Sequence, residues 1–128
     1  SQPASVSSGD PQTVAAPGGA GGATLDGVFS GAQAVRGQQQ FGDICAACHG
    51  LSEFTSIGFR RVWLRRTAWD FYQLISTTMP RDNPGGLSPE VYADIVAFFL
   101  RENGHSPGQT ELEADPAVLE HITFEPAP

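Results

Sequence analysis

The chain has 128 residues and a formal net charge of −7, and all seven of its basic residues are arginines. This length suits one domain. The negative charge argues against a nucleic-acid partner, because nucleic acids select basic surfaces. No stretch of apolar residues approaches the length needed to cross a bilayer. We therefore expect one globular domain that works as a monomer.

Residues 1–24 are rich in Ser, Ala, Gly, Pro and Gln and end in the run Pro17-Gly18-Gly19-Ala20-Gly21-Gly22. Such a composition cannot bury much apolar surface, so it predicts either a flexible tether, for example to a membrane, or an arm laid over the outside of the domain. The first residue is not Met, from which we expect an exported chain whose signal has been removed.

The first predicted helix runs from about Gly31 to Phe41. Ser30 is a suitable N-cap, because its hydroxyl can accept a hydrogen bond from a free backbone N–H of the first turn. Residues at intervals of three and four support the helix: Ala32, Val35 and Gln39. This helix leads directly into the most informative motif of the chain.

That motif is Cys45-Ala46-Ala47-Cys48-His49, which contains the only two cysteines. Cys-x-x-Cys-His is the attachment pattern of c-type haem. Positions i, i+3 and i+4 share one face of a helical turn, so two sulfurs and one imidazole can meet a single flat ligand. We expect Cys45 and Cys48 to form thioethers with haem vinyl groups and His49 to ligate the iron.

Three other interpretations of this motif remain open. A zinc site needs four N or S ligands, and the other histidines, His105 and His121, lack the necessary spacing. A redox-active dithiol belongs in a βαβ setting, for which the chain shows no parallel-strand pattern. A structural disulfide would leave His49 unexplained.

The second predicted helix begins at Thr67, which forms a capping-box-like pair with Asp70. It ends at Met79, because Pro80 disfavours the α conformation in the residue before it. A turn follows over residues 82–86. Apolar residues expected on one side of the helix are Phe71, Leu74 and Ile75.

A third helix is predicted from the N-cap Ser88 and Pro89 to Gly104, which ends it. Its apolar stripe is Val91, Ile95, Phe98 and Phe99. Asp115-Pro116 predicts one further short helix, with Val118, Leu119 and Ile122 facing inward. The alternation typical of strands is absent, so the sequence predicts an all-α domain.

Met79 is the only methionine, and it is predicted where a helix has just ended, on a loop from which its side chain can reach across to the iron. Electron-transfer haem iron generally has two protein ligands, and Met opposite His raises the reduction potential. We therefore predict Met79 as the distal iron ligand. His105 and His121 are alternatives, and both are expected at the surface.

Three stretches carry a resemblance to a known family: residues 27–41, 75–88 and 92–104. Residues 25–112 resemble the class I monohaem cytochromes c, in particular the bacterial domains associated with quinoprotein dehydrogenases and terminal oxidases. The resemblance implies three to five helices around one covalent haem c, with an arm over residues 1–24 and an acidic C-terminal extension over residues 113–128.

The resemblance also implies roles for several side chains. Gly37 would let the first and third helices cross closely, with Phe41 and Phe98 stacked near the crossing. Trp63 or Trp69 would bond a haem propionate. The chain departs from the family pattern in a short span between His49 and Met79 and in the tail after residue 112.

The function implied is one-electron transfer without catalysis in a respiratory chain. The expected donor is a membrane quinol-oxidising complex or a dehydrogenase, the acceptor a terminal oxidase, and the location the periplasm or the outer face of the cytoplasmic membrane. Two alternatives are an electron-transfer domain or subunit of a larger quinoprotein dehydrogenase or oxidase, and a haem sensor or peroxidase with an open distal site.

Charge is distributed unevenly along the chain. Arginines crowd into residues 60–66, whereas acidic residues load the C-terminal tail. Haem propionates and partner carboxylates both favour the fork of a guanidinium group, so either is a possible partner for these arginines. Because lysine is absent, partner steering would depend on this arginine patch or on an uncharged face.

Overall fold

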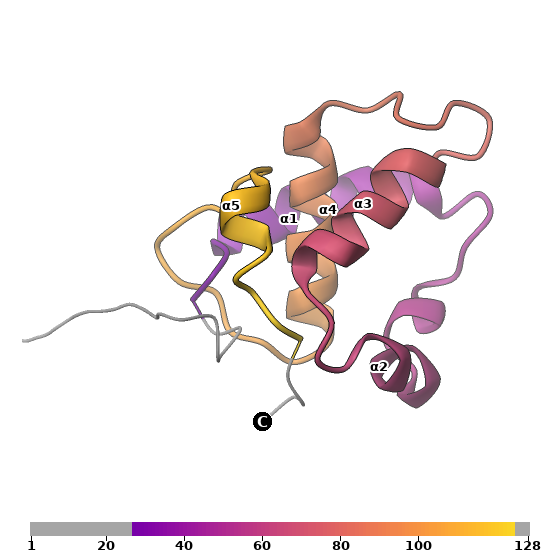
Figure 1. The fold of residues 1–128 in the computed structure, drawn as a ribbon. Coiled ribbons are helices and arrows are strands. Elements are labelled where there is room, and N and C mark those ends of the chain that lie inside the picture. The colour runs from indigo at the N-terminus through magenta and orange to yellow at the C-terminus, as the bar shows by residue number, and fades with distance from the viewer. Residues whose placement is uncertain (1–26, 125–128) are drawn as a thin grey trace, which may run out of the picture.

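The computed structural model describes residues 27–124, which fold into helices joined by loops, with no strand in that range (Figure 1). The all-α prediction is thus confirmed for this part of the chain. The predicted arm, residues 1–24, lies outside the described residues. The elements are α1 (Gly31–Gln40), the π-helical turn η1 (Phe41–Cys45), the 3-10 turn η2 (Leu51–Phe54), α2 (Ile57–Trp63), α3 (Ala68–Thr78), α4 (Pro89–Glu102) and α5 (Pro116–Leu119).

Side-chain caps begin the predicted helices where the sequence places them. Ser30 accepts from the Gln33 N–H at 3.0 Å at the start of α1. Thr67 and Asp70 form the expected reciprocal box at the start of α3. Ser88 caps α4 by accepting from the Val91 N–H, and Asp115 caps α5 by accepting from the Ala117 N–H. Each cap satisfies N–H groups that have no partner inside the helix.

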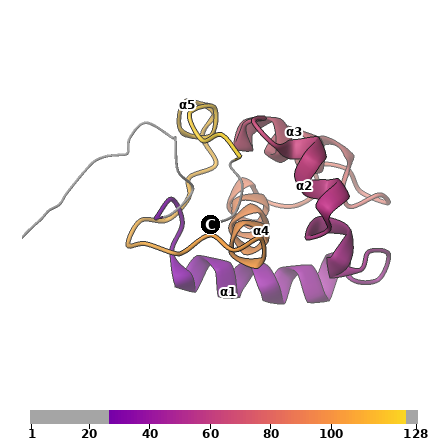
Figure 2. The same cartoon turned by 90° about the horizontal axis from the view of Figure 1, so that it is seen from below.

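The centre of the molecule is the crossing of α1 and α4. In Figure 2, α4 is seen end-on while α1 runs lengthwise beneath it. A Cβ on Gly37 would lie 2.0 Å from the Asp94 carbonyl oxygen and 2.8 Å from the Phe98 Cβ. Only glycine permits this approach, and Phe41 packs on Phe98 beside it with ring centroids 5.6 Å apart. The predicted close crossing is confirmed, although the two rings are tilted and not stacked.

The residues whose spacing predicts α1 lie on its exposed face. Ala32, Val35 and Gln39 are exposed, whereas Gln33 and Ala34 are buried. The reason is chemical, because the Gln33 amide donates to the Leu112 carbonyl at 2.9 Å and accepts from its N–H at 2.7 Å. These two hydrogen bonds replace bonds to water, so they offset the desolvation cost of burying the Gln33 amide. The buried face of α1 therefore depends on its contact with the Leu112 backbone, which helical spacing alone does not include.

The segment after α4 returns to the core. Leu119 and Ile122 are buried, as predicted, and the Ile122 carbonyl accepts from the Ala68 N–H at 2.8 Å. Phe124 packs against Trp63 and Phe71. Residues 113–124 are thus part of the same hydrophobic core as the helices that precede them.

The short helix α2 was not among the predicted elements. Ser56 caps it by accepting from the Phe59 N–H at 3.1 Å, and Trp63 is its buried residue. Beyond it, Arg65 adopts a left-handed conformation with φ of 69°, which turns the chain toward α3. This helix has only seven residues, two of them arginines, so it is too short to show a clear hydrophobic periodicity.

Candidate functional site

The predicted attachment motif forms a tight turn around one carbonyl oxygen. The turn η1 ends at Cys45. Its π-helical hydrogen bond runs from the Ala46 N–H to the Phe41 carbonyl, five residues earlier, at 2.9 Å. The Cys48 and His49 N–H groups both donate to the Cys45 carbonyl, at 3.1 and 3.0 Å. These i+3 and i+4 bonds give the helical turn that the motif spacing predicts.

The two thiols are free and differ in exposure. Cys45 is half-buried, and burial raises the pKa of its thiol, whereas Cys48 is exposed. A raised pKa keeps Cys45 as the neutral thiol at neutral pH. The structure shows no bond between the two sulfurs, so the disulfide interpretation gains no support.

The His49 ring is oriented by a carboxylate. Its Nδ1 lies 3.1 Å from Glu53 Oε1, and Glu53 Oε2 accepts from the Gly50 N–H at 2.8 Å. The hydrogen bond from the Gly50 N–H and, to a smaller extent, the one with His49 lower the pKa of Glu53 from its ordinary value. With Nδ1 donating to the carboxylate, the lone pair of the neutral ring lies on Nε2, the atom that is left for a metal.

Met79 stands at the end of α3 in extended conformation, as expected for a residue before proline. The Met79–Pro80 peptide bond is cis. The Met79 N–H donates to the Ile75 carbonyl at 3.0 Å, and its carbonyl accepts from the buried Tyr92 hydroxyl at 2.7 Å. The backbone of the predicted distal ligand is therefore fixed to both α3 and α4.

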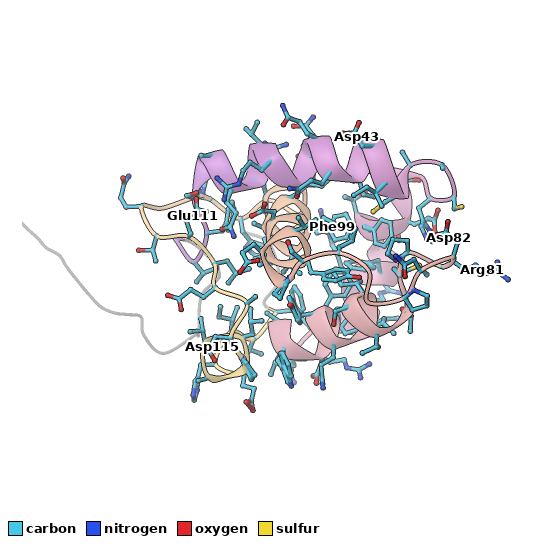
Figure 3. All side chains as sticks on the ribbon, turned by 90° about the horizontal axis from the view of Figure 1, so that it is seen from above. Asp43, Arg81, Asp82, Phe99, Glu111 and Asp115 are labelled. Carbon is cyan, nitrogen blue, oxygen red and sulfur yellow. The ribbon has the colours of Figure 1, made fainter. Side chains whose placement is uncertain are left out.

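The two loops that carry the predicted ligands lie on the same side of the molecule. The loop after η1 and the loop between α3 and α4 both project to the right in Figures 1 and 2. Figure 3 shows Asp43 of η1 and Arg81 and Asp82 of the second loop at this end, with Glu111 and Asp115 at the opposite end. The chain thus brings its predicted proximal and distal segments to one end of the fold.

Aromatic rings connect this end to the core. The His49 ring meets Phe54 edge-on with centroids 5.6 Å apart. Phe54 stacks on Phe99 of α4 at 4.4 Å with an interplanar angle of 10°. Phe41 contacts both phenylalanines at 5.9 and 5.6 Å. These contacts give the turn an apolar support.

A small cavity of about 50 Å³, partly open to solvent, lies next to this aromatic group, and none of the four predicted haem-binding residues lines it. Its walls come from α2, α3, α4 and the C-terminal segment, and they are mostly apolar, with polar groups from Arg60, Asn103 and His105. The lining residues are Phe59, Arg60, Trp63, Leu64, Phe71, Val96, Phe99, Leu100, Asn103, His105 and Phe124.

The remaining candidate residues have distinct environments. His105 is buried, contrary to the surface position predicted for it, because it follows the end of α4 and lines the cavity, while His121 is exposed as predicted. Trp63 lies in the cavity wall with the Arg66 guanidinium 4.8 Å from its ring centroid. Trp69 stacks on Tyr72 instead.

Within residues 27–124, no three or more His, Cys, Asp or Glu side chains are grouped so that they could hold a metal ion. The zinc interpretation of the motif therefore gains no support there. No helix in the same range is both long and apolar enough to span a membrane. Comparisons with protein-family models, curated proteins and solved structures find no match to this chain.

Glu53 and Tyr92 are site residues that motif reasoning did not find. The signal for Glu53 was available, since it lies four residues after His49 and three after Gly50, the spacings of a helical pair and of a capping box. No local spacing connects Tyr92 to Met79, because thirteen residues separate them. Only the packing of α4 against the loop brings them together.

Proposed function

We propose that this protein is a one-electron carrier with a class I cytochrome c fold around one covalent haem c. The observation that carries the proposal is the turn of residues 45–49. Its backbone N–H groups converge on the Cys45 carbonyl, and it presents two free thiols and an imidazole that Glu53 orients. One flat ligand with two reactive edge groups and one metal uses all three side chains, whereas a zinc ion needs a fourth ligand.

Attachment requires only addition chemistry. Each thiol of Cys45 and Cys48 adds across a vinyl double bond, so that one S–H bond and one C=C π bond are replaced by a C–S and a C–H bond. No external oxidant or reductant is consumed. The exposed Cys48 and half-buried Cys45 are both free for this reaction.

His49 would supply Nε2 as proximal ligand and Met79 its thioether sulfur as distal ligand. When bound, the haem supplies an iron that accepts and returns one electron. The chain's part is to keep both ligands in place in either state, which the Glu53 contact of His49 and the Tyr92 contact of Met79 support. A sulfur ligand opposite imidazole favours a high potential.

A location in the periplasm or at the outer face of the cytoplasmic membrane belongs to this proposal, with a quinol-oxidising complex or dehydrogenase as donor and a terminal oxidase as acceptor. The exposed arginines of α2 and the turn after it suit an acidic partner surface. Arg61 and Arg65 are exposed there, beside the exposed apolar side chains of Ile57 and Val62. A small apolar contact with charged neighbours is typical of brief redox encounters.

The test is the optical spectrum of the oxidised protein, with Met79→Ala as the paired variant. We expect a weak near-infrared charge-transfer band from sulfur to ferric iron that disappears in the variant, and no carbon monoxide binding by the reduced wild type. Absence of the band, or its survival in Met79→Ala, would refute Met79 as ligand. Carbon monoxide binding by the wild type would favour the sensor or peroxidase alternative.

A further inference from the structure

The contact between Glu53 and His49 has two separable consequences, one for the fold and one for the iron. Glu53 uses both carboxylate oxygens, with Oε1 3.1 Å from His49 Nδ1 and Oε2 2.8 Å from the Gly50 nitrogen. We infer that Glu53 is a positioning residue that lowers the reduction potential of the iron by holding a full negative charge against the Nδ1–H of His49. This inference rests on the proposed function.

The chemical reason is the acceptor's charge. A glutamate is ionised at neutral pH, and a hydrogen bond to an ionised acceptor is about twice as strong as a neutral one. A carboxylate on the distant ring nitrogen raises the basicity of the ligating nitrogen. A more basic ligand stabilises ferric iron more than ferrous iron, so the potential falls.

The geometry makes this contact specific. Glu53 is the first-turn acidic residue of η2, and its second oxygen is anchored to the turn by the Gly50 N–H. The carboxylate is therefore not a freely rotating surface group, although its side chain is 52% exposed and that of His49 is 28% exposed. Solvent weakens the long-range part of the interaction, but the direct hydrogen bond remains.

The competing explanation is that Glu53 acts only as a cap for η2. A cap affects the free energy of unfolding and leaves the iron unchanged. The two roles are separated by Glu53→Gln, which keeps the size of the side chain and a carbonyl acceptor but removes the charge. The reduction potential is the readout that a purely structural role would not move.

Asp43 provides the matched control. It is an exposed carboxylate two residues before Cys45, at the same end of the molecule in Figure 3, and the His49 contact is made by Glu53 and not by Asp43. Asp43→Asn removes the same charge from the same end without touching the ring. Its shift measures the general electrostatic effect.

The experiment is an equilibrium redox titration of the haem-loaded wild type, Glu53→Gln, Glu53→Ala and Asp43→Asn at neutral pH and one ionic strength. We expect Glu53→Gln to favour the reduced form about tenfold, which corresponds to about 59 mV for one electron. Glu53→Ala should shift at least as far, and Asp43→Asn much less. If Glu53→Gln does not accumulate, the alanine variant tests the same claim.

Two results would overturn the inference, and they differ from each other. Equal potentials for wild type and both Glu53 variants, or shifts no larger than that of Asp43→Asn, would leave Glu53 as a cap while the electron carrier stands. Failure of the wild-type chain to acquire haem would overturn the proposed function and this inference with it. As a second readout, the His49 Nδ1 proton of the reduced protein should exchange with water faster in Glu53→Ala.

Discussion

The crossing of α1 and α4 and the turn of residues 45–49, which follows α1 in the chain, are held in place by different interactions. At the crossing, Gly37 leaves no room for a Cβ, and van der Waals contact fixes the geometry. In the turn, Cys48 and both alanines are exposed, and hydrogen bonds to the Cys45 carbonyl fix the backbone. Packing thus sets the scaffold, while hydrogen bonds present the reactive groups.

Among the substitutions considered, Gly37→Ala should have the largest effect on the free energy of unfolding. The added methyl would meet the Asp94 carbonyl and the Phe98 Cβ, so we expect a loss of about 3 kcal/mol in the free energy of unfolding. Denaturant unfolding of the haem-loaded protein measures this. Gly42→Ala is the control, because a Cβ there meets nothing within 4 Å. Equal stability of the two variants would contradict the close crossing.

Tyr92→Phe should weaken the link between the scaffold and the distal loop. The buried hydroxyl donates to the Met79 carbonyl at 2.7 Å, so its removal should cost about 1 kcal/mol of unfolding free energy. The near-infrared band should also become weaker as Met79 gains freedom. Tyr72→Phe is the matched control on α3. A band unchanged by Tyr92→Phe would show that the distal loop does not depend on this contact.

Glu111 gives the crossing a dependence on pH. Ser30 and Arg36 hold the pKa of Glu111 below its ordinary value of 4.5, so the unfolded chain binds more protons than the folded chain. The stabilisation is therefore complete above that ordinary pKa and is lost as the pH falls through the lower, folded-state pKa.

Thermal unfolding between roughly pH 6 and 3 tests this, because the fall in Tm at low pH should be shallower in Glu111→Gln than in wild type. Glu113→Gln, two residues away and exposed in the wild type, should follow the wild-type profile. Parallel profiles for wild type and Glu111→Gln would show that this carboxylate does not contribute to the pH dependence of stability.

Substituting both Arg61 and Arg65 by Gln should have the smallest effect on the fold, within about 0.5 kcal/mol, because both residues are exposed. The expected change is in function, since the rate of electron transfer to an acidic partner should become less dependent on ionic strength. Arg101→Gln, whose guanidinium is engaged by Gln38 and Glu102, serves as the control. Identical salt dependence in wild type and the double variant would exclude the arginine patch as a docking surface.

Local signals predicted the helix starts well. Ser30, Thr67 and Ser88 cap the predicted helices, because capping depends on residues within three positions of each other. The end of α3 at Met79 followed from the restriction that Pro80 imposes. The backbone of the attachment turn also followed from spacing alone.

Contacts between residues far apart in the chain could not be predicted from such local signals. The burial of Gln33 depends on the backbone of Leu112, and the fixing of Met79 depends on Tyr92. The buried position of His105 and the cavity that it lines require three helices and the C-terminal segment to be in place. Such features depend on packing between distant segments, for which a single sequence gives no spacing rule.

If Cys45 and Cys48 hold a haem through two thioether bonds, the haem stays on the chain after denaturation, and intact-mass analysis of the denatured protein detects it. The protein should be produced in cells that attach haem c, alongside Cys45→Ser/Cys48→Ser. We predict that the wild-type chain carries the added mass of one haem after denaturation and that the double variant carries none. A wild-type chain without added mass under these conditions would show that Cys45 and Cys48 do not attach haem.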